Sequence, residues 1–87
     1  MEGRFIDAEV EVFFQEKPGP PAGFRWEGKE YRIAEILEFR RELDFKRSWW
    51  RRRHRDWYKV RTSDGHVFEL YFHRGPGRRY WVLLREL

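Results

Sequence analysis

The fold of this chain is decided by residues 57–73, WYKVRTSDGHVFELYFH. Two segments rich in aromatic and β-branched residues flank Ser63-Asp64-Gly65, a pattern typical of a β-hairpin. A two-residue loop would place Val60 opposite Glu69 and mix apolar with charged side chains on both faces. A three-residue loop that ends in a left-handed glycine places Val60 opposite Phe68 instead. We predict this second register, because its cross-strand pairs match in character.

A third strand is predicted at residues 80–87, after a loop at residues 75–79. If that loop has five residues, the opposed pairs are Leu70 with Leu84, Phe72 with Val82 and Glu69 with Arg85. One face of the resulting meander is then apolar and comprises Tyr58, Val60, Phe68, Leu70, Phe72, Val82 and Leu84. The reverse face is partly aromatic and comprises Trp57, Tyr71, Trp81 and Leu83. Since both faces carry apolar side chains, a second layer of strands is expected.

The first half of the chain supplies candidates for that layer. Val10, Val12 and Phe14 occupy alternate positions, which indicates a half-buried strand. Residues 17–23 hold three prolines and two glycines, so we expect a stiff loop there. A hairpin is expected around residues 27–30.

Residues 33–45 fit two alternatives: a helix, or a long bulged strand to about residue 39, which we favour. The chain thus predicts a mainly β fold, with α+β as the alternative, in a single domain spanning residues 1–87. We expect antiparallel meander sheets packed as two small layers or as a partly open barrel. At most one short helix is expected, near residues 38–54.

Composition narrows the function classes. The 87 residues include no cysteine, which excludes disulfides and cysteine-based metal or nucleophile sites. No apolar run approaches the ~20 residues of a membrane span, and no signal peptide is visible, so we expect a cytoplasmic protein without a membrane partner. The many charges and few thermolabile residues fit a thermophilic source. The charge is uneven: residues 1–38 hold five basic and nine acidic side chains, whereas residues 39–87 hold fourteen and six.

The most function-like feature is the basic segment, residues 46–55, KRSWWRRRHR. Cations suit phosphates and indole rings suit stacked bases, so the segment is a candidate surface for single- or double-stranded nucleic acid. The expected contact residues are Lys46, Arg47, Trp49, Trp50, Arg51, Arg52, Arg53 and Arg55. The alternative is a solvated loop whose tryptophans pack on the end of the meander. Three further arginines around the next loop could extend the surface: Arg74, Arg78 and Arg79.

The order of aromatic landmarks carries a resemblance. Those landmarks are Phe24, Trp26, Gly28, Tyr31 and Ile33, then Trp49-Trp50, residues 55–62, Asp64-Gly65, residues 67–72 and Trp81-Val82-Leu83. In this order they resemble a small uncharacterised bacterial domain family of stand-alone members. From Trp49 onward the chain is also similar to the carboxy-terminal tail of catalytically inactive Y-family DNA polymerase homologues of mutagenesis cassettes. That similarity implies a role in DNA repair or damage tolerance through binding, although the chain lacks polymerase and clamp-binding segments.

Catalytic and metal sites are not predicted. His66 and His73 would lie at opposite ends of one strand, about 23 Å apart, too far to share a metal. Ser63, Asp64 and His66 superficially resemble a triad, but a tight turn projects them outward. We therefore expect no enzyme, no metal and no cofactor. The rival to nucleic-acid binding is a protein-interaction or homodimerisation surface formed by Trp57, Tyr71, Trp81 and Leu83.

Overall fold

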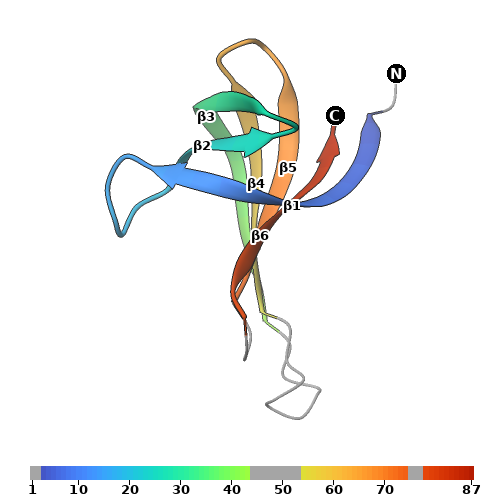
Figure 1. The fold of residues 1–87 in the computed structure, drawn as a ribbon. Coiled ribbons are helices and arrows are strands. Elements are labelled where there is room, and N and C mark those ends of the chain that lie inside the picture. The colour runs from blue at the N-terminus through green and yellow to red at the C-terminus, as the bar shows by residue number, and fades with distance from the viewer. Residues whose placement is uncertain (1–2, 44–53, 75–77) are drawn as a thin grey trace.

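Six antiparallel strands close into a small barrel in the computed structural model, which describes residues 3–43, 54–74 and 78–87. The strands are β1 (Arg4–Phe14), β2 (Pro21–Trp26), β3 (Lys29–Glu42), β4 (Arg55–Thr62), β5 (Val67–His73) and β6 (Tyr80–Glu86). Each strand pairs with its successor, and β1 also pairs with β6, which closes the barrel (Figure 1). These ranges contain no helix. The prediction of a mainly β fold is confirmed, with a barrel rather than two separate layers.

The β4–β5 hairpin has the predicted register. Val60 lies opposite Phe68, and Tyr58 lies opposite Leu70. Gly65 adopts a left-handed φ of 91°, and its amide donates to the Thr62 carbonyl at 3.0 Å. A glycine reaches this conformation without the steric cost that a Cβ brings, which is why the three-residue turn forms here.

The predicted β5–β6 register is right as far as Glu69 and wrong for the rest of β5. Glu69 does lie opposite Arg85, but a bulge follows, so that Leu70 faces Leu83 and Phe72 faces Trp81. Leu83 is therefore fully buried in the core. The bulge turns Leu83 and Trp81 from the predicted outer face to the inside of the barrel, because a one-residue shift exchanges the two faces of a strand.

The first half of the chain follows the favoured alternatives. β3 is a long strand with bulges between Ile33 and Glu35 and between Ile36 and Glu38, and it ends slightly later than expected. The segment 44–53, where the remaining part of a short helix was considered, lies outside the described residues. The predicted loop at residues 17–23 is too long, because β2 already begins at Pro21.

The β2–β3 turn consists of Glu27 and Gly28 alone, both with positive φ (52° and 77°). Positive φ at both central residues defines a type I′ turn, whose twist suits a two-residue hairpin. The turn starts β3 in register, with Trp26 opposite Lys29.

The barrel is closed at one end and open at the other. Its buried core comprises Phe24, Val60, Phe68, Leu70 and Leu83. β2 pairs with β3 only as far as Arg32, whereas β3 continues along β4 to Glu42. In Figure 1, β3 to β6 accordingly run on past the level at which β1 and β2 close the barrel. The inner face of this four-stranded extension is the place where a ligand can reach the interior.

Candidate functional site

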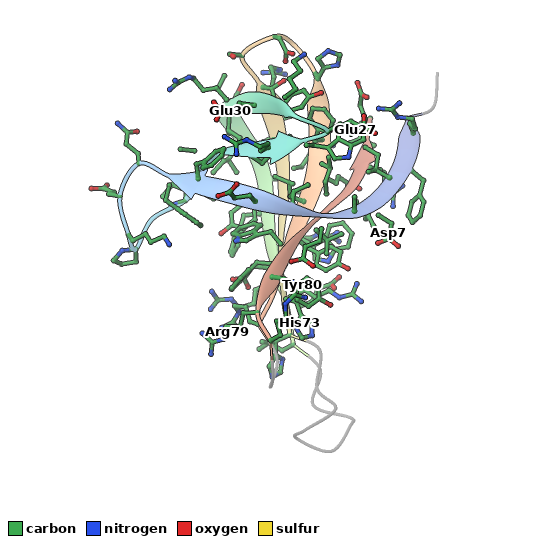
Figure 2. All side chains as sticks on the ribbon, viewed as in Figure 1. Asp7, Glu27, Glu30, His73, Arg79 and Tyr80 are labelled. Atoms are coloured by element: carbon green, nitrogen blue, oxygen red, sulfur yellow. The ribbon has the colours of Figure 1, made fainter. Side chains whose placement is uncertain are left out.

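A depression of about 660 Å³ lies at the open end of the barrel. We call it the mouth. Residues from the end of β1, the β1–β2 loop, β4, β5 and β6 line it: Phe14, Lys17, Pro18, Gly19, Asp56, Tyr58, Phe72, Arg79 and Trp81. Arg79 lies near Tyr80 and His73 at the narrow end of the extended sheet (Figure 2). The mouth thus collects side chains that are up to 67 positions apart in the sequence.

Aromatic rings form the floor of the mouth. The Trp81 ring lies 5.0 Å from Phe72, 5.5 Å from Tyr58 and 6.0 Å from Phe14, measured between centroids. Tyr58 in turn lies 4.9 Å from Phe39, whose side chain is 48% exposed. Burial raises the pKa of the Tyr58 phenol above its ordinary value. The four lining rings, Phe14, Tyr58, Phe72 and Trp81, are half-buried, so part of each stays accessible to a planar ligand.

The charge around the mouth is positive. Asp56 is 7% exposed, and its Oδ1 atom accepts hydrogen bonds from Arg41 Nε at 3.0 Å and Arg74 Nε at 3.1 Å. Two arginines therefore neutralise one carboxylate and leave a positive charge over. Lys17 lies over the Phe14 ring at 5.0 Å.

The other mouth cations have no acidic partner in the described structure. Neither Lys17 nor Arg79 forms an ion pair with a carboxylate of residues 3–43, 54–74 or 78–87. Four cations consequently surround one carboxylate at the mouth. This surplus attracts an anionic ligand.

Most of the basic segment lies outside the described residues: Lys46, Arg47, Trp49, Trp50, Arg51, Arg52 and Arg53. Its last expected contact residue, Arg55, begins β4, next to Asp56 of the mouth. The last described residue before the segment is Leu43. It follows Glu42, the last residue of β3, which lies opposite Arg55 of β4. The described residues on either side of the stretch 44–53, Leu43 and His54, therefore both lie at the open end of the barrel, beside the mouth.

The acidic first half of the chain pairs with other arginines. The carboxylates of Glu9, Glu11 and Glu35 are each within ion-pair distance of one arginine, namely Arg78, Arg25 and Arg61, respectively. The hydrogen bond from Arg78 lowers the pKa of Glu9. None of these three carboxylates pairs with Arg55, so they do not compete with a ligand for that cation.

The outer face of the extension carries two of the four residues predicted for a protein interface. Trp57 and Tyr71 lie 5.8 Å apart. Arg40 covers the Trp57 ring at 5.2 Å, and Arg55 covers the Tyr71 ring at 4.8 Å. The other two predicted residues, Trp81 and Leu83, point into the barrel, so the four do not form one apolar patch.

The turn at the closed end contains the residues that superficially resemble a triad. Asp64 accepts a hydrogen bond from the Thr62 hydroxyl, which is the main reason that the pKa of Asp64 is lowered. His66 Nδ1 lies 2.6 Å from Glu86 Oε2 of β6, and His66 Nε2 lies 3.8 Å from Asp64 Oδ2, so both ring nitrogens face carboxylates. Within the described ranges, no three histidine or acidic side chains gather in a metal-binding arrangement.

Sequence reasoning missed the mouth as a site. Tyr58 and Phe72 were assigned to the core, and Phe14 to a half-buried strand, because apolar alternation does not show where the barrel ends. Trp81 was assigned to the opposite face. The one available signal was the excess of aromatic residues, seventeen of 87, over what so small a core holds.

A family model described as a domain of unknown function (DUF6504) matches residues 1–87. The chain belongs to this family. No curated protein and no solved structure matches it significantly. The DUF6504 description names no activity. Among the described residues of this DUF6504 chain, no helix is long and apolar enough to cross a membrane.

Proposed function

We propose that this domain binds single-stranded nucleic acid at the mouth of the barrel. The observation that carries the proposal is the coincidence of half-buried aromatic rings with surplus cations in one depression. Bases stack on Trp81 and Phe14, while Lys17 and Arg79 contact the phosphates. Stacking on aromatic side chains contributes about 1–3 kcal/mol per base and tolerates any base, because every base has a π-face.

Single strands fit the mouth better than a duplex. The rings lie within a depression, so a base must leave its neighbours to contact them. In a duplex the faces of the bases are already stacked on one another, and only the edges and phosphates are accessible. A duplex would therefore meet the cations of the mouth but not its rings.

The basic segment extends this surface in our proposal. It holds six cations and two indoles between residues 46 and 55, and the described residues that flank the stretch 44–53, Leu43 and His54, lie beside the mouth. They would contact the strand on either side of the bases held by the rings. We further propose a non-enzymatic role in DNA repair or damage tolerance inside the cell, which rests only on the sequence resemblance from Trp49 onward to the tail of inactive Y-family polymerase homologues.

Binding to a protein remains the second candidate. Its remaining support is the outer pair Trp57 and Tyr71, which Arg40 and Arg55 cover. The salt dependence of binding separates the two candidates, because phosphate contacts weaken steeply with salt and aromatic contacts do not.

Fluorescence anisotropy of labelled oligonucleotides tests the proposal. We expect an oligothymidine to bind, with its affinity falling at least about tenfold between roughly 50 and 200 mM salt. A duplex of equal length should bind more weakly. Absence of binding at the lower salt concentration, or equal affinity for duplex and single strand, would contradict the proposal.

Two pairs of neighbouring residues provide matched controls. Phe14 lies in the mouth, whereas Phe13 lies beneath Arg25 with a ring-to-guanidinium distance of 5.5 Å. Phe14→Leu should weaken binding about fivefold or more, and Phe13→Leu should not. Arg79 lines the mouth, whereas Arg78 pairs with Glu9.

The arginine pair is tested through the salt dependence. Arg79→Gln should make the slope of log affinity against log salt shallower by about 0.7, the value for one phosphate contact with a single strand. Arg78→Gln changes the net charge equally and should leave that slope unchanged. Equal effects of both variants would indicate a general charge effect rather than a site.

A further inference from the structure

We propose that two copies of this chain pair through the open edge of β3. Beyond Arg32, β3 has a hydrogen-bonded partner on one side only within the described residues, because β2 ends its pairing there. The β1–β2 loop approaches this edge at residues 33–36, where both line a groove of about 320 Å³. The edge is therefore uncovered from residue 37 to the end of the strand, as far as the structure describes the chain. An uncovered edge strand presents unpaired backbone groups and is a ready template for another strand.

The sequence of this edge favours a second copy of itself as the partner. In an antiparallel pair, directly opposed side chains lie on the same face of the sheet. A twofold axis that relates two copies of β3 therefore passes between one residue and its own copy. An axis through any of the charged residues, at position 38 or positions 40–42, places that residue opposite its own copy, with like charges in contact. An axis through Phe39 avoids this, whereas an axis through Leu37 would fall in the bulge between Ile36 and Glu38 and would place Glu38 opposite Ile36.

The Phe39 axis also supplies favourable contacts. It places Glu38 of each copy opposite Arg40 of the other copy. Two ion pairs then flank a central pair of phenyl rings. Directly opposed side chains in an antiparallel pair have Cβ atoms about 4.5–5.5 Å apart, within reach of both kinds of contact. Within one chain, Arg40 Nε forms an ion pair with Glu38 Oε2 at 3.8 Å, and both side chains are 55% exposed, so a second copy can reach them at this edge and exchange their partners. Phe39, 48% exposed, is among the most exposed large apolar side chains of the described residues.

Pairing through β3 would join the two mouths. The two four-stranded extensions, β3 to β6, become one eight-stranded sheet whose inner faces lie on the same side. Neighbouring strands are about 4.8 Å apart, so the joined surface is about 34 Å across. Phe39 and its copy lie at its centre, next to Tyr58 in each chain. This consequence rests on the proposed function, whereas the pairing itself does not.

Charge reversal in complementary pairs tests the pairing without nucleic acid. Native mass spectrometry and sedimentation velocity would compare the wild type with Glu38→Arg and with Arg40→Glu. The wild type should dimerise in a concentration-dependent way. Each single variant places like charges opposite each other twice, so its dimer dissociation constant should rise at least about tenfold. Circular dichroism would verify that each variant remains folded.

Mixing the two single variants is the decisive step. In a mixed pair the arginine introduced at position 38 of one variant meets the glutamate introduced at position 40 of the other. The unchanged Arg40 and Glu38 also meet, so the heterodimer should form where neither homodimer does. The double variant, carrying both Glu38→Arg and Arg40→Glu, should recover the wild-type dimer.

Three results would overturn the pairing. These are a monomeric wild type, single variants that dimerise like the wild type, and a mixture of the two variants that stays monomeric. The proposed function is tested separately by the binding of a short oligothymidine to a monomeric variant. Binding by that variant would show that the function does not depend on the pairing.

Discussion

Asp56→Asn should destabilise the fold and tighten binding to nucleic acid, two effects of opposite sign. Asp56 is buried beside the mouth, where its Oδ1 atom accepts hydrogen bonds from Arg41 and Arg74. The substitution keeps the shape of the side chain and removes its negative charge. Stability depends on the two hydrogen bonds, whereas binding depends on the charge, so one variant tests both parts of the account.

The structure sets both magnitudes. A hydrogen bond to a charged group contributes about 1.5–3 kcal/mol. The Asn oxygen still accepts from one arginine, and the Arg41 side chain, 53% exposed, can be solvated instead. We therefore expect a loss of about 1–2 kcal/mol in the free energy of unfolding. Removing one negative charge about 6–8 Å from a bound phosphate contributes about 0.5–0.7 kcal/mol in a water-like dielectric, which is a two- to threefold gain in affinity.

Thermal unfolding and anisotropy at low salt measure the two effects. The melting temperature should fall by about 4–8 °C for each kcal/mol lost. Asp64→Asn is the matched control, because Asp64 lies in the turn beyond the far end of β4, about 20 Å or more from Asp56. At that distance its charge is screened, so affinity should not change. Weaker binding by Asp56→Asn, or an equal gain with Asp64→Asn, would refute the argument.

Three further predictions concern the fold. Leu83→Ala should lower the free energy of unfolding, measured by urea titration, by about 2–5 kcal/mol, because it empties a fully buried site. Leu84→Ala should lower it clearly less, since Leu84 is only half-buried. Equal losses would refute the β6 bulge. Glu27→Asn should raise the free energy of unfolding by up to about 1 kcal/mol, since Asn tolerates the positive φ of a type I′ turn better than Glu does. An unchanged melting temperature would count against that turn. The pKa of Asp64 is lowered in the folded state, first of all by the hydrogen bond from the Thr62 hydroxyl. The ionised Asp64 therefore stabilises the fold above the ordinary carboxyl pKa, and this stabilisation is lost as the pH falls through the folded-state pKa. The wild type should therefore lose its advantage over Asp64→Asn below about pH 4 in melting experiments, and a constant difference down to about pH 3 would contradict this.

The sequence predicted local pairing well and failed where the pattern was ambiguous. In the β4–β5 hairpin, apolar and charged side chains alternate, and Gly65 selects the turn, so the register followed. In β6 the run Val82-Leu83-Leu84 is continuously apolar and either leucine could face the core. The choice is made by closure against β1, where Ala8 lies opposite Leu83, a contact that no local pattern contains.

The mouth could not be predicted from the sequence, for a related reason. It exists because β3 extends beyond β2. The periodicity of residues 33–45 did not distinguish a long strand from a helix, so the length of β3 was not predictable. Phe14 and Lys17 reach Trp81 only once the barrel has closed. The basic segment could be recognised because its cations and indoles are contiguous, and its role in binding stays a prediction.

The indole resonances of the protein offer the most direct test of binding at the mouth. A ¹⁵N-edited NMR titration with oligothymidine would follow Trp81 in the mouth, Trp57 on the outer face and Trp26 beside the β2–β3 turn. The account predicts that the Trp81 indole N–H shifts progressively and saturates, while that of Trp26 stays in place. Shifts at Trp57 or Trp26 with an unmoved Trp81, or no shift at all, would contradict it.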